Sequence, residues 1–241
     1  MAPLLIATDT RFPMSEPRRA LAAMPLFAGL PAPEIERLGR VIEQRTFERD
    51  QEINREGGAW EGLFIVKSGK VKLSKRAMGR ELTIAIMEPG EPLNIAPLFE
   101  GGPNVFQTGA MGRVTCYYLP AEAARAFVST HPTVQSALLR ALNVRIRRLA
   151  SLASEMSFTG VSGRLAAWVL EEARRKGVRT ERGLAVPRDL SMRELASLLG
   201  TVRRVLSRSA AELRREGAIE VTPEWIVIRD PERLRARAGE R

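Results

Sequence analysis

The stretch from Ser191 to Val221, SMRELASLLGTVRRVLSRSAAELRREGAIEV, constrains the fold of this chain more than any other. Ser191 and Glu194 have the spacing of a capping box, which starts a helix by satisfying free backbone N–H groups. Leucines then recur at helical spacing up to Gly200, a residue that adopts the left-handed conformation of a sharp turn at no steric cost. Because a second helical pattern follows at once, the stretch predicts a helix-turn-helix.

The second predicted helix, from about residue 202 to 216, has two different sides. Its apolar residues at helical spacing are Val205, Leu206 and Leu213, and its outward polar residues are Arg203, Arg204, Ser207 and Arg208. Guanidinium groups near the start of such a helix suit the major groove of DNA, where they bind phosphate or pair with guanine. Arginines also occur on helices that merely face solvent. This helix alone therefore leaves both interpretations open.

The residues after this helix strengthen the DNA interpretation. Apolar residues alternate on both sides of the turn sequence TPEW, at Ile219, Val221, Ile226 and Ile228. Such alternation predicts two strands joined by a turn. A helix pair followed by a hairpin is the pattern of a winged helix-turn-helix.

Charge and cysteine content narrow the class of protein. The net charge is +10, and residues 160–241 hold 18 Lys and Arg against 12 Asp and Glu, which favours a polyanionic partner. The single cysteine, Cys116, excludes an intrachain disulfide framework and a four-cysteine metal or iron-sulfur site. The apolar opening MAPLLIA is too short for a signal peptide or a membrane span. We therefore expect a cytoplasmic protein with no membrane partner.

The first half of the chain changes periodicity twice. Residues 1–23 are expected to form a flexible arm, and a short helix with Ile35, Leu38 and Ile42 on one face follows it. From Gln44 to about Leu119 the apolar period is two, in short runs separated by Gly and Pro. The clearest run, LFIVKSGKVKLSK, predicts a hairpin that turns at Ser68 and Gly69. Several such strands indicate a small antiparallel barrel or sandwich.

One long helix is predicted from Pro132 to about Phe158, with proline in its tolerated first turn. Its apolar residues at alternating spacings of three and four are Leu139, Leu142, Ile146, Leu149, Ala153 and Met156. This is a heptad seam, and a helix of about 40 Å is longer than a small domain needs, so a second copy of the helix is the expected partner. The alternative is that the seam packs on its own barrel. Glycines between Thr159 and Gly163 predict a hinge after it.

Helix, small barrel, long helix, glycine hinge and winged helix-turn-helix, in that order, resemble the CRP/FNR family of bacterial transcription regulators. The matching segments include LFIVKSGKVKLSK, EPGEPLNIAPLFEGG and SGRLAAWVLEEA. The resemblance implies an α+β fold: a cyclic-nucleotide-binding-like β-roll at 24–130, a dimerisation helix at 131–158 and a winged helix-turn-helix at 159–241. It also implies a homodimer that binds a pseudo-palindromic DNA site, with RNA polymerase as a further partner.

The resemblance also locates an effector pocket, and here the chain departs from the family. Members that bind cyclic AMP carry Gly-Glu and Arg-Ser pairs in the phosphate-binding cassette and a Thr-Ser pair on the long helix. The matching pocket residues here are Asn94, Ile95, Val105, Phe106 and Leu149. Without the arginine, the charge that a phosphate needs is missing. We therefore expect no cyclic AMP binding in that mode and predict no cofactor.

The resemblance raises two other sensing modes of the family, through an iron-sulfur cluster and through haem. The cysteines that hold the cluster in oxygen-sensing relatives are missing. Haem would need an axial ligand in an apolar pocket, and the one histidine, His131, stands before Pro132, where an exposed or capping role is expected. Cys116 lies in an apolar run and is expected to be a buried small hydrophobe. No metal site is predicted.

The resemblance assigns the DNA contacts. Many relatives carry Arg-Glu early in the recognition helix, where the glutamate accepts from cytosine; the matching pair here is Arg203 and Arg204. An acceptor has become a donor, which favours guanine or phosphate. Arg204 and Arg208 are therefore the expected base readers, Arg203 a phosphate or base contact, and Thr201 and Ser207 auxiliary contacts.

One alternative function remains open from the sequence. The barrel could make this a metabolite-sensing or haem- and gas-sensing regulatory module whose main partner is another protein. The arginine-rich helix argues against that interpretation. An enzyme is not expected, because one histidine, no metal-ligand cluster and no nucleophile motif give no basis for catalysis.

Overall fold

The computed structural model of the chain describes residues 16–239. Of the predicted N-terminal arm, residues 1–15 lie outside this range. The rest of the prediction needs a correction, because Glu16–Ala22 forms helix α1 and Leu21 is only 1% exposed. Leu21 packs in one apolar cluster with Phe27 and Leu38, and burial of this leucine accounts for the order of the segment.

Short helices and eight strands form the first half of the molecule. The 3-10 turn η1 (Pro25–Phe27) and helix α2 (Ala32–Val41) follow α1, and Ile35 and Leu38 of α2 are buried as predicted. One antiparallel sheet has the order β1 (Glu43–Phe47), β8 (Val114–Pro120), β3 (Gly62–Ser68) and β6 (Pro92–Leu93). The other has the order β2 (Glu52–Asn54), β7 (Gln107–Ala110), β4 (Val71–Ala77) and β5 (Arg80–Met87).

The predicted hairpin at Ser68 and Gly69 is wrong, although both of its strands exist. Strand β3 pairs with β6 and β8, whereas β4 pairs with β5 and β7, so the turn carries the chain from one sheet to the other. Val66, Val71 and Leu73 pack in the core between the sheets. A hairpin and a sheet-to-sheet crossover share the same alternation and the same turn residues. The real hairpin joins β4 to β5 through Met78 and Gly79, both with positive φ.

Helices α3, α4 and α5 complete the N-terminal half of the molecule. Helix α3 (Ala96–Glu100) lies between β6 and β7, α4 (Ala121–Thr130) follows β8, and α5 (Pro132–Phe158) is the long helix predicted from the sequence. Val134 and Leu138 of α5 pack with the N-terminal helices against the first sheet, and Leu152 packs in the core between the sheets. One side of α5 is therefore anchored to its own β-roll.

The C-terminal domain is a winged helix-turn-helix with more strands than predicted. It comprises α6 (Val161–Lys176), β9 (Val178–Thr180), β10 (Gly183–Pro187), α7 (Met192–Leu198), α8 (Arg203–Arg215), β11 (Ile219–Val221), β12 (Trp225–Ile228) and α9 (Pro231–Ala238). Its antiparallel sheet has the order β11-β12-β10-β9. The sequence predicts α7, α8 and the hairpin of β11 and β12, whereas β9, β10 and α9 were not predicted.

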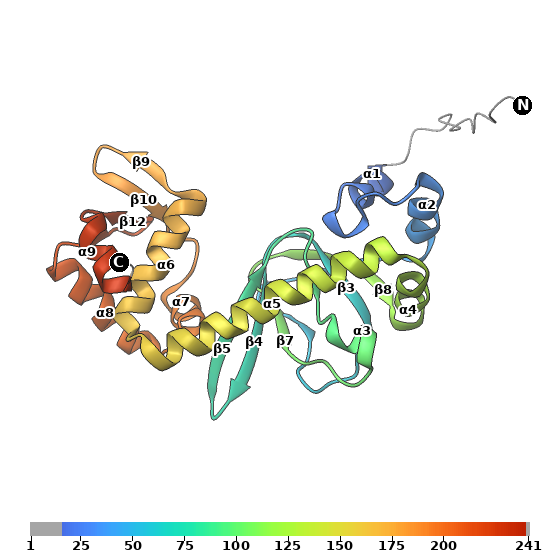
Figure 1. Cartoon of the computed structure of the whole chain (residues 1–241), viewed down its shortest axis with the longest axis horizontal. Coiled ribbons are helices and arrows are strands. Elements are labelled where there is room, and N and C mark those ends of the chain that lie inside the picture. The colour runs from blue at the N-terminus through green and yellow to red at the C-terminus, as the bar shows by residue number, and fades with distance from the viewer. Residues whose placement is uncertain (1–15, 240–241) are drawn as a thin grey trace, which may run out of the picture.

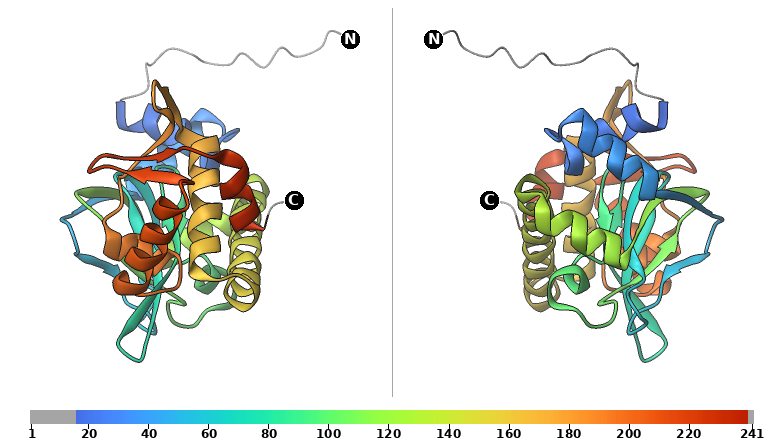
Figure 2. Two further views of the ribbon diagram at one scale, coloured as in Figure 1. Left: turned by 90° about the vertical axis from the view of Figure 1, so that its left-hand side faces the viewer. Right: turned by 90° about the vertical axis from the view of Figure 1, so that its right-hand side faces the viewer.

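Helix α5 crosses the molecule and joins its two ends (Figure 1). The C-terminal domain lies at its C-terminal end, and α1, α2 and α4 lie near its N-terminal end. Figure 2 views the molecule from these two ends and shows α6 and α8 in one view and α2 with α4 in the other. The long helix thus connects the β-roll to the C-terminal domain.

Candidate nucleic-acid interface

The turn between α7 and α8 has the local chemistry that the sequence predicts. The Ser191 hydroxyl accepts from the Glu194 N–H at 3.2 Å, and the Glu194 carboxylate accepts from the Ser191 N–H at 2.7 Å, which completes the capping box. Gly200 ends the helix with φ of +62°, and the Thr201 N–H donates to the Ala196 carbonyl at 2.9 Å. A left-handed residue here directs the chain straight into α8.

Helix α8 is held by its apolar side. Leu206 and Leu213 are fully buried in the core of the domain, and Ser209 is 7% exposed. Arg203, Arg204, Ser207 and Arg208 are all exposed, and Thr201 in the turn is half-buried. Arg203 lies one turn before Ser207, and Arg204 lies one turn before Arg208. Four of the five predicted contacts therefore share the outer face of one helix.

The recognition arginines differ from most other arginines of the domain. Arg229 and Arg182 pair with Glu220, and Arg237 pairs with Glu212 and Glu216. Across residues 16–239, no hydrogen bond or ion pair involves Arg203, Arg204 or Arg208. No side chain caps the start of α8 either, so its free N–H groups and positive dipole end add to the local positive potential.

The wing, the hairpin of β11 and β12, has a turn that is held by hydrogen bonds. The Thr222 hydroxyl accepts from the Trp225 N–H at 3.0 Å, and the Thr222 N–H donates to the Trp225 carbonyl at 2.8 Å. Arg188 donates from its guanidinium to the Pro223 carbonyl at 3.1 Å. The turn is thus closed by local hydrogen bonds rather than by packing.

The predicted seam of α5 is largely uncovered in a single chain. Leu139 is 53% exposed and Ile146 is 61% exposed, which is high for apolar side chains of this size. Leu149, Ala153 and Met156 are also exposed, and Leu142 is half-buried against the N-terminal core. Met156 has a neighbour in its own chain as well, since a Cβ placed on Gly200 would lie 3.4 Å from its sulfur.

The predicted pocket residues have different surroundings in the structure. Asn94 is buried, and its side chain bonds both backbone groups of Phe106, accepting from the N–H at 3.2 Å and donating to the carbonyl at 3.0 Å. Ile95 packs in the core on the helix side of the first sheet. Leu149 is exposed on α5.

Val105, the fifth predicted pocket residue, borders an open cleft. Glu56, Lys75, Glu100 and Asn104 also line this cleft. The ammonium of Lys75 lies 2.6 Å from the carboxylate of Glu56, and this hydrogen bond holds the pKa of Glu56 below its usual value. The cleft therefore presents two carboxylates and one ammonium next to the position at which cyclic-AMP-binding relatives carry an arginine.

Asn94 adopts an uncommon backbone conformation to make its contacts. Its φ is +43°, in the left-handed region that asparagine tolerates better than most residues. The Asn54 carbonyl oxygen accepts from the Thr108 hydroxyl at 3.1 Å and lies 3.4 Å from the Asn94 amide nitrogen. The cassette is thus closed by side chains of the protein itself.

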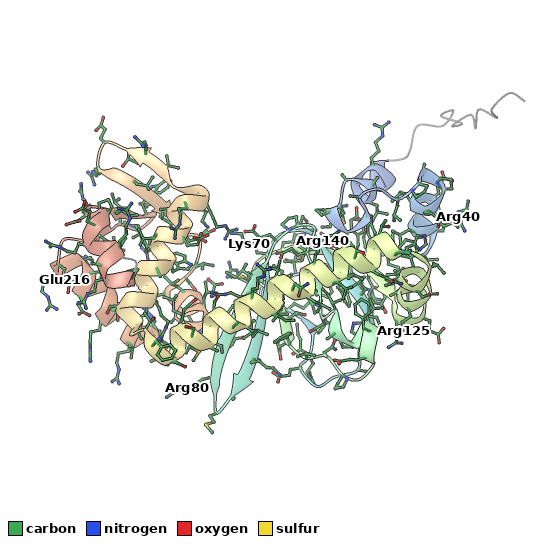
Figure 3. All side chains as sticks on the ribbon, in the orientation of Figure 1. Arg40, Lys70, Arg80, Arg125, Arg140 and Glu216 are labelled. Carbon is green, nitrogen blue, oxygen red and sulfur yellow. The ribbon has the colours of Figure 1, made fainter. Side chains whose placement is uncertain are left out.

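The helix-turn-helix is also docked on the β-roll of its own chain, a contact that the sequence analysis missed. The buried Ser197 hydroxyl donates to the Glu81 carbonyl at 3.0 Å and bonds the Thr83 hydroxyl at 2.8 Å. The Asp189 carboxylate accepts from Lys70 at 2.7 Å and from Lys176 at 2.9 Å. Lys70 lies on the edge of the β-roll that faces this domain (Figure 3). No local pattern marks Ser197 or Asp189 as docking residues, because their partners on the β-roll are over a hundred positions away.

His131 and Cys116 both have contacts within the protein that account for their positions. His131 stacks on Phe127, and its two ring nitrogens contact the Phe127 carbonyl at 2.6 Å and the Glu34 carboxylate at 3.1 Å. Cys116 is fully buried as expected, and burial raises the pKa of its thiol to about 12. Among residues 16–239, no cluster of His, Cys, Asp and Glu is suited to a metal ion, and no helix is long and apolar enough to cross a bilayer.

Comparison with known proteins agrees with this architecture. A family model described as a cyclic nucleotide-binding domain matches residues 44–131, and one described as a Crp-like helix-turn-helix domain matches residues 163–237. The CRP-like cAMP-activated global transcriptional regulator of Mycobacterium tuberculosis is 31% identical over 90% of this chain and 98% of its own length. The cyclic AMP receptor protein of Thermus thermophilus is 28% identical over 86% of this chain and 93% of its own.

Solved structures share the fold at lower identity. The c-di-GMP-responsive global regulator CLP of Xanthomonas campestris superimposes with a TM-score of 0.73 at 21% identity, covering 83% of this chain and 100% of its own. A CooA mutant from Carboxydothermus hydrogenoformans gives a TM-score of 0.72 at 20% identity, covering 83% of this chain and 89% of its own. The two-domain arrangement around a long helix is common to all three.

Proposed function

The chain belongs to the CRP/FNR family of bacterial transcription regulators and is a DNA-binding regulator, and on this basis we propose that it acts as a homodimer whose two α8 helices enter successive major grooves of a pseudo-palindromic site. Arg204 and Arg208 contact base edges, Arg203 contacts phosphate or a base, and Thr201 and Ser207 assist. The relatives are regulators rather than enzymes.

The observation that carries this proposal is the set of unpaired guanidinium groups on α8. A folded domain usually neutralises its cations locally, as this one does at Glu220 and Glu216. Three exposed arginines without an intramolecular partner can give all their donors to an external acceptor. Their planar forks match guanine edges and phosphate oxygens, so duplex DNA is the acceptor that fits best.

The uncovered seam of α5 supports the dimer. Leu139, Ile146 and Leu149 lie on the side of the helix that its own β-roll leaves open. A second α5 would cover this side through heptad packing and would place the two helix-turn-helix domains at neighbouring ends of the pair. The family's pseudo-palindromic sites require this symmetry.

We also propose that the effector, if one exists, is not cyclic AMP bound as in the relatives named for it. The Asn94 side chain already bonds Phe106, Val105 brings no charge, and Glu56 and Glu100 border the adjoining cleft. A cyclic phosphate would meet carboxylates where it needs a guanidinium. Calorimetry should detect no cyclic AMP binding tighter than about 100 μM, and binding below that concentration would disprove this part.

Two further proposals follow from the family role. A regulator of this type acts where chromosomal DNA and RNA polymerase are, so we place the protein in the cytoplasm and expect contact with RNA polymerase at the promoter. RNA polymerase contact can be tested by retention of labelled polymerase on promoter DNA with and without the regulator.

Selection of bound duplexes from a random library tests the proposed function directly. We expect a two-fold symmetric consensus, and an affinity that falls steeply with salt because phosphate contacts release counterions. The slope of log K against log salt should correspond to several phosphate contacts per dimer. Recovery of no consensus, together with a flat salt dependence, would refute DNA recognition by α8.

A further inference from the structure

A single buried arginine joins the end of the long helix to the helix-turn-helix. Arg164, in the first turn of α6, is 8% exposed. Its Nε donates to the Leu199 carbonyl at 2.9 Å, and its Nη1 donates to the Glu155 carbonyl at 3.4 Å and to the Thr159 carbonyl. Glu155 and Thr159 belong to the end of α5, and Leu199 caps α7 directly before Gly200.

These acceptors explain how a buried cation is tolerated without a carboxylate. The last carbonyls of a helix have no partner within it and carry the negative end of the helix dipole. The Thr159 carbonyl at the end of α5 and the Leu199 carbonyl at the end of α7 are such groups, and they bond Nη1 and Nε of Arg164 respectively. The Glu155 carbonyl, one turn earlier in α5, accepts from the Thr159 N–H at 3.0 Å as well as from Arg164. Because a buried charge costs several kcal/mol unless it is well bonded, both contacts must persist while the side chain stays buried.

Close packing around Arg164 leaves little freedom at the predicted hinge. Only Thr159 and Gly160 separate α5 from α6. A Cβ on Gly163 would lie 2.7 Å from the Thr159 side chain and 2.9 Å from the Arg237 carbonyl, so this glycine allows α6 to pack closely on the end of α5 and on α9. The direction of α7 relative to α5 therefore depends on the contacts at this junction.

We propose that Arg164 is a positioning residue that fixes the angle between α5 and the helix-turn-helix, and thereby the half-site spacing that the dimer accepts. This inference rests on the proposed function, since it requires two recognition helices held by paired α5 helices. One base pair of extra spacing shifts a half-site by about 3.4 Å and rotates it by about 35°, which a rigid junction cannot follow.

The experiment compares full-length parent, Arg164→Lys and Arg164→Gln on duplexes that carry two half-sites at varied spacing, and on duplexes with one half-site. A lysine keeps the charge but carries its donors on a single nitrogen, so it lacks the two separate nitrogens, Nε and Nη1, with which Arg164 bonds the Leu199 carbonyl and the end of α5. We expect the parent to prefer one spacing by at least about tenfold, and this preference to fall to about threefold or less in both variants. Single half-site affinity should stay within about threefold of the parent.

Each outcome decides a question. Arg179→Lys, the same exchange at an exposed position of β9 in the same domain, is the matched control and should keep the parental spacing preference. Unchanged spacing preference in both Arg164 variants overturns the inference. Parallel loss of single half-site binding in both also overturns it, because it assigns Arg164 to stability alone. No spacing preference in the parent would instead refute the proposed dimeric function.

Discussion

Near the start of helix α8 the guanidinium groups of Arg203, Arg204 and Arg208 stand in solvent with no partner among residues 16–239, whereas in the β-roll cassette the polar groups of Asn54, Asn94 and Thr108 bond one another and the backbone. The first region keeps its donors available, and the second has already used them. Availability of hydrogen-bonding groups, rather than the fold alone, therefore separates the region proposed to bind DNA from the cassette, whose polar groups are bonded within the chain.

The two regions also differ in the free-energy cost of leaving a polar group without a protein partner. Exposed arginines are hydrated and need no protein acceptor. Buried amides without partners would each cost about 1–3 kcal/mol, so the buried side chains of Asn54 and Asn94 need partners within the protein. Asn94 does this by taking a left-handed conformation that brings its amide to both backbone groups of Phe106.

The largest expected effect is a loss of DNA affinity when the arginines of α8 are removed. The double substitution of Arg204→Ala and Arg208→Ala should weaken binding to the selected site by at least about a hundredfold, because each base-reading arginine contributes about 1–3 kcal/mol. Fluorescence anisotropy at fixed salt measures this. Arg235→Ala removes one charge from an exposed position on α9 and should change affinity by about threefold or less. Equal losses per charge in the two variants would show that α8 contributes only non-specific attraction.

The cassette should respond in stability rather than in DNA recognition. Asn94→Ala leaves the Phe106 backbone groups unsatisfied and puts alanine, which tolerates the left-handed region less well than asparagine, at this φ, so urea unfolding should show a loss of about 2–4 kcal/mol. Asn94→Gly removes the same hydrogen bonds without the backbone strain and should be about 1 kcal/mol less destabilised. If Asn94→Ala were as stable as the parent, the cassette would not be held by this side chain.

The docking of the two domains should show a smaller effect. Ser197→Ala leaves the Glu81 carbonyl and the Thr83 hydroxyl short of a partner, which should cost about 1–2 kcal/mol of stability. Hydrogen exchange of α7 amides should speed up in that variant. Ser207→Ala, on the exposed side of α8, is the control and should leave exchange and stability unchanged. Similar behaviour of the two serine variants would contradict a docking role for Ser197.

Local chemistry was the part of this molecule that the sequence predicted best. The capping box at Ser191, the turn at Gly200 and the helix from Pro132 to Phe158 each depend on residues close together in the chain, and all three are present. The exposed position of Arg204 and Arg208 follows from the same helical period. Their contacts with DNA remain a proposal.

Features that depend on distant residues were missed or misjudged. The turn at Ser68 and Gly69 has hairpin chemistry, and only the pairing of β3 with β8 makes it a crossover. Leu21 gave no signal of order, because its partners are Phe27 and Leu38 in other elements. The partners of Arg164 are backbone carbonyls, which carry no sequence signature at all.

The smallest predicted effect concerns pH and the ion pairs that flank Ser197. Burial would raise the pKa of Asp189, but hydrogen bonds from Lys70 and Lys176 outweigh it, so the pKa lies below its usual value. A depressed pKa in the folded state gives stability that is present above the unfolded value, about 3.8, and is lost as pH falls through the folded value.

Asp189→Asn removes the titrating group and should be less stable than the parent by under about 1 kcal/mol at pH 7, as for a partly exposed pair. This gap should stay constant from pH 7 to about 5 and close below about pH 4, in urea unfolding at each pH. A gap that already closes between pH 7 and 5 would mean that another group, and not Asp189, controls the docking of the helix-turn-helix on the β-roll.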